Sequence, residues 1–181
     1  MTPEAPLEQT EHGLVPQGEG WFVLNLREAR WYVSDDRPAF ADVEGDTEFG
    51  QLGFHVSVLQ PGQPLSMYHW EADQEGFLVL SGEAVAVVEG EERPLRAWDY
   101  LHCPPDTRHV LVGAGERPCV LIAVGARDKS MAEDESWGGY PVDAAAARLG
   151  ASVEAETHDP EVAYAHVTRR QPTRYRPDWL G

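Results

Sequence analysis

Short apolar runs, separated by turn residues at intervals of roughly 8–12 residues, dominate the middle of the chain. In the first run, Phe54, Val56 and Val58 alternate with His55 and Ser57, which is the pattern of a half-buried strand. This spacing is typical of an all-β fold, an antiparallel barrel or sandwich. Strands are predicted at residues 54–58, 77–80, 84–88, 100–103, 110–112 and 119–124.

The sequence changes character on either side of this region. Residues 1–50 are predicted to form an N-terminal arm, in which the apolar run 21–26 supplies a strand that covers the barrel. The barrel itself is expected to span residues 51–127. Residues 128–181 are predicted to form a helical extension that ends in a basic tail.

Helix signals in this extension mark two short helices. Asp143 is a candidate N-cap and Gly150 a candidate stop for the first, and Asp159 begins the second, followed by a proline in the first turn. The tail that follows is interpreted as solvated, or as a segment that docks on the acidic body. Its basic residues are Arg169, Arg170, Arg174 and Arg176.

Composition limits the classes of partner. The formal net charge of −17 argues against nucleic acid and anionic membranes, because both select a cationic surface. Cys103 and Cys119 lie in apolar runs and are expected to be reduced and buried. No apolar stretch approaches the roughly 20 residues of a membrane helix, and the first residues lack a signal-peptide pattern. We therefore expect a cytoplasmic protein.

Four side chains within the barrel region are candidate metal ligands. His69 and Glu71 are two residues apart, so on a strand they point to the same face. Glu75 begins the next apolar run, and His109 begins a later one. Imidazoles and carboxylates that converge inside a barrel are suited to a divalent transition metal. We expect one such ion, with iron, manganese, zinc and nickel as the candidates.

In these residues and their spacing the chain resembles the cupin superfamily. The family's first motif has a turn glycine, His-x-His, a glutamate and a second glycine, and its second motif has Gly, Pro-x-Gly and His. The first motif corresponds here to Gly62, His69, Glu71, Glu75 and Gly82, and the second to Trp98, Pro104, Asp106 and His109. The resemblance covers about residues 50–127 and implies a small antiparallel jelly-roll β-barrel.

The sequence departs from the family pattern at three positions. Glu71 stands where the family has its second histidine, and Trp98 and Asp106 replace both glycines of the second motif. Glu71 is either a fourth ligand or, outside the coordination shell, a catalytic general base beside a ligand triad of His69, Glu75 and His109. A barrel that has lost its metal is the third reading, but two carboxylates close together without a cation would repel each other.

Other polar residues near these motifs are weaker candidates. His55 is predicted to face the outside or the mouth of the barrel, and Arg108 is predicted to point away from His109 toward a surface ion pair. Cys103 is interpreted as part of the core, because no group that would activate its thiol is visible.

The resemblance implies two classes of function. The first is a metal-dependent enzyme that acts on a small organic molecule, with oxygenase-like or isomerase-like chemistry. The second is a cupin that binds a small-molecule ligand without turnover. Barrels of this type leave sheet edges exposed, so we expect a homodimer, with the arm segment 21–26 available for the contact.

Overall fold

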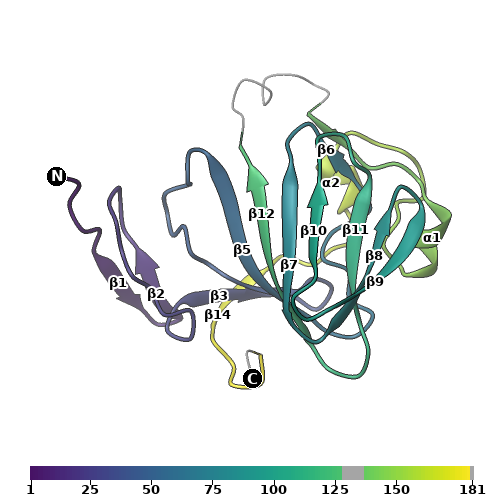
Figure 1. Cartoon of the computed structure of the whole chain (residues 1–181). Coiled ribbons are helices and arrows are strands. Elements are labelled where there is room, and N and C mark those ends of the chain that lie inside the picture. Colours follow the sequence, from purple (N-terminus) through teal and green to yellow (C-terminus); the bar gives the residue numbers. More distant parts are fainter. Residues whose placement is uncertain (128–136, 180–181) are drawn as a thin grey trace.

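The computed structural model describes residues 1–127 and 137–179. Antiparallel strands make up most of the ordered structure, and two sheets face each other as a jelly-roll β-barrel that does not close into a continuous cylinder (Figure 1). The larger sheet has the strand order β10-β7-β12-β5-β4-β3-β14. Its strands are β3 (Arg30–Val33), β4 (Ala39–Ala41), β5 (Leu52–Leu59), β7 (Glu75–Ser81), β10 (Tyr100–Cys103), β12 (Cys119–Ala126) and β14 (Gln171–Arg174).

The smaller elements complete the architecture. A three-stranded sheet, in the order β11-β8-β9, forms the opposite wall, and two pairs of short strands, β1-β2 and β13-β6, lie outside the main sheets. The three-stranded sheet contains β8 (Glu83–Val88), β9 (Glu91–Arg96) and β11 (His109–Ala114). The paired strands are β1 (Leu7–Thr10), β2 (Gly13–Pro16), β6 (Trp70–Glu71) and β13 (Gly138–Gly139), and the helices are α1 (Ala144–Arg148) and α2 (Pro160–Ala163).

Alternation along the strands sorts side chains between the barrel interior and two outer layers. Leu59, Phe77 and Leu121 belong to a core between the two sheets, together with both free cysteines. On the outer face of the larger sheet, Val56 and Val58 pack in a second cluster with Trp31. A third cluster lies between β8, β11 and α1. It comprises Tyr68, Val87, Val110, Val112, Ala145, Ala146 and Ala151.

Most of the predicted strands and both helices are confirmed. The β8–β9 hairpin turns at Glu89 and Gly90. Both residues have positive φ, as the two central residues of a type I′ turn require. Asp143 caps α1 by accepting a hydrogen bond from the backbone N–H of Ala146, and Asp159 caps α2. Neither helix of the described residues has the length and apolar character that a membrane span requires.

The expectations for the flanking segments need correction. The run 21–26 forms no strand; Trp21 makes one isolated bridge to Glu4 and is half exposed. The strands of the arm are β1, β2, β3 and β4, and the last two continue the larger sheet. The basic tail is likewise ordered, because β14 pairs with β3 at the edge of that sheet. Residues 128–136 of the extension lie outside the described residues.

Candidate metal centre and cavity

Two histidines meet inside the barrel because the segment just before β6 and the start of β11 pair there by an isolated antiparallel bridge. The backbone N–H of His109 donates to the carbonyl of His69 at 2.8 Å, and the N–H of His69 donates to the carbonyl of His109 at 3.1 Å. The imidazole centroids are consequently only 4.7 Å apart. Both residues are buried, and His109 is 1% exposed. The sequence-predicted pair is therefore brought together from positions 40 residues apart.

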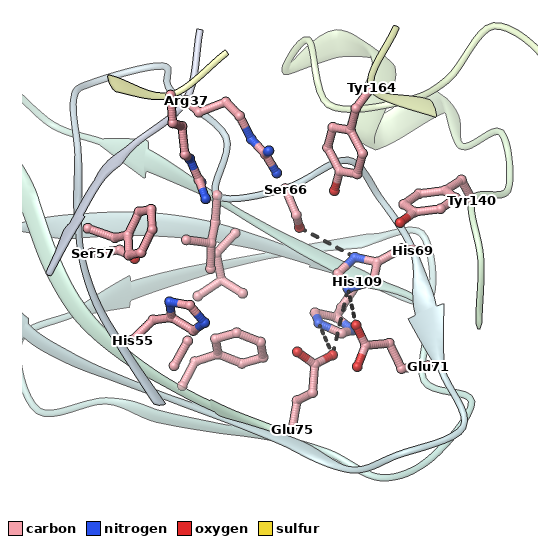
Figure 2. Close-up of a pocket in the computed structure, with 16 residues that line it drawn as sticks. Arg37, His55, Ser57, Ser66, His69, Glu71, Glu75, His109, Tyr140 and Tyr164 are labelled. Carbon is pink, nitrogen blue, oxygen red and sulfur yellow. Dashed lines mark hydrogen bonds and ion pairs between the residues drawn. The ribbon is translucent and has the colours of Figure 1, made fainter. Parts of the chain in front are cut away.

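Glu75 completes a three-residue cluster from the first position of β7. Its Oε2 lies 3.1 Å from Nε2 of His109 and 3.7 Å from Nε2 of His69. One ligand atom from each of the three residues lies within 4.8 Å of the others. Figure 2 shows the two rings and the carboxylate turned toward a common point. They are three of the four candidate ligands from the sequence, and they match the alternative in which Glu71 lies outside the coordination shell.

The outer nitrogen of each ring is held by the backbone. Nδ1 of His69 lies 2.9 Å from the carbonyl oxygen of Met67, and Nδ1 of His109 lies 2.9 Å from that of Thr107. In each ring Nδ1–H donates to the carbonyl, which directs Nε2 toward the cluster and fixes the ring orientation. This arrangement of a ligand and its supporting carbonyl is common around protein-bound metals.

The geometry fits a metal ion. Metal–ligand bonds of about 2.0–2.2 Å place neighbouring ligand atoms about 3.0–3.6 Å apart, close to the separations of 3.1 and 3.7 Å found here. Nε2 of His109 is buried and makes no hydrogen bond of good geometry, although Oε2 of Glu75 is near. A cation at this nitrogen, either a proton held by Glu75 or a coordinated metal ion, offsets the cost of burying it.

Glu71 lies beside the triad rather than within it. Its Oε1 is 3.6 Å from Nε2 of His69, and its side chain is 21% exposed, compared with 15% for Glu75. The group of mutually close ligand atoms contains His69, Glu75 and His109 without Glu71. Glu71 therefore lies at the edge of the cluster and lines the adjacent cavity.

The charges within the cluster shift the pKa values of His109 and Glu75. Burial alone lowers the pKa of His109, but the adjacent Cys103 thiol and Glu75 carboxylate outweigh burial and raise that pKa to about 10. Burial raises the pKa of Glu75, whereas His109 and His69 lower it, with a net decrease. In the metal-free protein, a protonated His109 therefore neutralises Glu75.

The cluster forms one wall of an open cavity with a volume of about 270 Å³. Figure 2 shows His55 and Ser57 across the cavity from the triad, with Tyr140 and Tyr164 near His69. His55 lies on the cavity side of β5 and is exposed to the cavity, so of the two expected positions, the outside and the mouth of the barrel, the mouth is the one found. Burial lowers its pKa, so the ring is neutral at neutral pH.

Sequence reasoning missed the two phenols and the two arginines of this cavity. Tyr140 and Tyr164 come from the C-terminal extension, where no motif marks them, and Arg37 comes from the loop between β3 and β4. Arg170 was interpreted as part of a tail that is solvated or docks on the acidic body, and it lines the cavity immediately before β14. Each comes from a segment outside the barrel motifs, so only long-range contacts place it here, such as the hydrogen bond from the backbone N–H of Met67 to the hydroxyl of Tyr164.

The remaining candidates from the sequence lie outside the metal cluster. Arg108 is exposed at the surface. Its backbone N–H donates a hydrogen bond to Oε1 of Glu89. Cys103 is buried in the core next to His109, as expected. Trp98 and Asp106 have φ of 74° and 67°, so both keep the left-handed backbone that the family's glycines supply. The turn geometry of the second motif is therefore retained without glycine.

Comparison with known proteins supports this reading of the barrel. The Cupin domain family matches residues 55–125. No protein of curated function matches the sequence. Among solved structures, the polyketide cyclase RemF from Streptomyces resistomycificus is 10% identical with a TM-score of 0.52, covering 60% of this chain and 80% of the cyclase. This likeness shows the shared fold.

Two other cupin structures are similar over shorter stretches or at lower scores. A Cupin 2 conserved barrel domain protein from Salinispora arenicola is 20% identical, with a TM-score of 0.48, over 62% of this chain and 92% of that one. A sugar phosphate isomerase from Silicibacter pomeroyi is 24% identical, with a TM-score of 0.47, over 51% of this chain. This chain spans only 61% of the isomerase's length. The family match thus covers residues 55–125, and the jelly-roll barrel around them is the fold that the sequence resemblance implies.

Proposed function

We propose that this protein is a metal-dependent enzyme that acts on a small organic molecule, and that His69, Glu75 and His109 hold one divalent transition metal. The observation that carries this proposal is that the three ligand atoms converge on one wall of an open cavity. A closed site with four protein ligands would favour a structural ion, whereas three ligands beside a cavity leave room for a substrate.

A bound divalent ion at this position would polarise a substrate oxygen. The residues of this chain supply the proton transfer. Glu71, beside the triad, removes a proton from the substrate and returns it at a neighbouring atom. The pKa of Tyr140 is raised, mainly by burial and further by the nearby Tyr164 and Glu71. Its phenol therefore stays protonated and can donate a hydrogen bond. These roles describe an isomerase-like reaction.

Oxygen-dependent oxidation is the second candidate, and the ligand set favours it. Two histidines and one carboxylate with open positions are the arrangement of non-haem iron oxygenases. This reaction would need iron at the site, whereas a metal-assisted proton transfer would work with zinc, manganese or nickel as well. The identity of the metal is therefore the first property that separates the two reactions.

Elemental analysis of protein purified without chelator tests the metal centre. We expect about one equivalent of a transition metal in the wild-type protein, and a loss of about tenfold or more in affinity for Glu75→Gln and His109→Ala. Glu71→Gln is the matched control for Glu75→Gln, since it makes the same change on a neighbouring carboxylate. It should retain the metal. Wild-type protein without stoichiometric metal would refute the proposal, and metal loss in Glu71→Gln would make Glu71 a fourth ligand.

Activity then separates the enzyme from a non-catalytic binding protein. Metal-loaded protein is incubated in deuterated water with a panel of hydroxy and oxo carbonyl compounds, and exchange at carbon is followed by mass spectrometry, with oxygen uptake recorded in parallel. Glu71→Gln should lose exchange by about a hundredfold or more while keeping its metal. Saturable binding from the same panel, with neither exchange nor oxygen uptake, would identify the non-catalytic alternative.

A further inference from the structure

Two arginines line the same cavity as the metal ligands, and each is held by an aromatic ring. The guanidinium of Arg37 lies 4.5 Å from the ring centroid of Tyr164, and that of Arg170 lies 4.4 Å from the ring centroid of Phe40. Stacking of this kind orients a planar guanidinium while its N–H groups stay free to donate hydrogen bonds at the edge. Both cations are thus positioned before any ligand arrives.

Neither guanidinium is neutralised by the residues around it. Within residues 1–127 and 137–179, the ion pairs of the protein include neither Arg37 nor Arg170, while Arg30, Arg93, Arg127 and Arg148 each have a carboxylate partner. Nε of Arg170 is buried and has no hydrogen-bond acceptor. An unsatisfied charged donor is among the costlier groups to bury, so its retention in a cavity points to a ligand.

The two arginines also destabilise each other. Burial, and then the positive charge of Arg37, lower the pKa of Arg170 to about 10. Two like charges that share a partly buried site favour the binding of an anion between them. Arginine forks match the planar oxygens of a carboxylate and the tetrahedral oxygens of a phosphate, with two parallel hydrogen bonds for each fork.

The charges of the whole cavity lead to the same conclusion. Its wall carries two carboxylates, from Glu71 and Glu75, and two guanidiniums, from Arg37 and Arg170. These four charges cancel, so a divalent ion at the triad would leave the cavity with an excess of two positive charges. A neutral ligand would leave that excess uncompensated, whereas an anionic one would remove part or all of it.

We propose that Arg37 and Arg170 form an anion subsite, which binds a carboxylate or phosphate group of the substrate while the rest of that molecule reaches the metal ligands. This assignment rests on the proposed function only in calling the ligand a substrate. Figure 2 shows Arg37 on the opposite side of the cavity from Glu75, so one small molecule can contact both. The subsite orients the substrate, and the chemistry takes place at Glu71 and the triad.

The test is a titration of the full-length protein, metal-loaded and metal-free, with inorganic phosphate and with succinate at constant ionic strength. Binding is followed through the Nε–H resonances of the arginines in proton–nitrogen spectra, assigned with Arg170→Lys. Saturable shifts of the Arg170 resonance by either anion support the subsite. The tighter of the two anions identifies the group as a phosphate or a carboxylate.

Variants locate the binding. Arg170→Met and Arg37→Met should each weaken binding of the tighter anion by about tenfold or more. Arg174→Met is the matched control, because Arg174 is an exposed arginine on β14 outside the cavity. The anion affinity of this variant should stay within about twofold of the wild-type value. Having two cavity variants keeps the test valid if one of them fails to fold.

The outcomes distinguish this inference from the proposed function. Unchanged anion affinity in both cavity variants, or an unshifted Arg170 resonance in wild type, would overturn the subsite even if the triad binds metal. Conversely, anion binding that depends on Arg37 and Arg170 in a protein that takes up no metal would support the subsite and refute the metal-dependent function.

Discussion

The contact between His109 and Glu75 links metal binding to protonation at the level of single residues. In the metal-free protein the pKa of His109 is raised to about 10, so this ring is protonated at neutral pH. A metal ligand must be neutral imidazole, and metal binding therefore displaces a proton. Metal and proton compete for the same nitrogen, which Glu75 stabilises in either state.

We predict that binding of one metal ion at about pH 8 releases about one proton from His109, whereas a histidine with the ordinary pKa of about 6.5 would release almost none. Apparent metal affinity should accordingly rise about tenfold per pH unit until the pH reaches the pKa of His109. Calorimetric titrations in two buffers of different ionisation enthalpy count the protons. A count near zero at this pH would contradict the raised pKa.

The same pair sets the pH dependence of stability in the metal-free protein. The folded-state pKa of His109 is above the unfolded value, so its stabilisation is fully present below about pH 6.5 and is lost as the pH rises toward about 10. The melting temperature of metal-free protein should fall over this range. Glu75→Gln removes the carboxylate and serves as the control, with a flatter profile.

At the scale of elements, the C-terminal strand binds the flanks of the chain to the barrel. β14 pairs with β3, and Trp179 then packs against Trp31 with ring centroids 4.9 Å apart. Trp31 is fully buried and Trp179 is 4% exposed, so both belong to the outer core of the larger sheet. Because Arg170 immediately precedes β14, this anchoring also positions one arginine of the cavity.

We predict that Trp179→Ala lowers the free energy of unfolding by about 3 kcal/mol, the usual cost of removing a buried indole and leaving a cavity. Urea unfolding followed by circular dichroism measures the change. Trp98→Ala is the control, since Trp98 is 77% exposed and its truncation should cost less than about 1 kcal/mol. Equal losses for the two variants would mean that the C-terminal segment is not anchored in the core.

The elements that were predictable from sequence are those whose pattern is local. β5, β7 and β12 could be predicted because alternating or continuous apolar residues identify strands within a short window. β14 has the sequence Gln-Pro-Thr-Arg, which carries no such pattern and becomes a strand by pairing with β3 from a distant part of the chain. β9 also lacks an apolar pattern, because most of its residues are exposed.

The same distinction holds for the candidate site. His69, Glu75 and His109 belong to motifs within the barrel, so their spacing predicted a cluster. Arg37 and Arg170 enter the cavity only because β3, β4 and β14 extend the larger sheet around it. Apolar content alone was misleading at 21–26, where Val23 is 81% exposed and the segment forms no strand.

At the scale of the whole molecule, the β1–β2 hairpin of the N-terminal arm stands away from the barrel (Figure 1). Trp21 and Val23 on this arm are 53% and 81% exposed, which is unusual for two large apolar side chains so close in sequence. A second copy of the chain is the partner expected for such a surface, because most soluble oligomers are symmetric homodimers. The net charge of −17 opposes this association at low ionic strength.

We therefore predict a homodimer of twice 20.1 kDa in light scattering coupled to size exclusion. Raising the salt concentration from about 50 mM to about 500 mM should tighten it, because salt screens the repulsion between two acidic chains. Val23→Asp should shift the protein toward monomer. Val162→Asp should leave the dimer intact, since Val162 is 60% exposed on α2, outside the segment that carries Trp21 and Val23. A wild-type monomer at micromolar concentration in high salt would exclude the dimer, and the arm would then need a different partner.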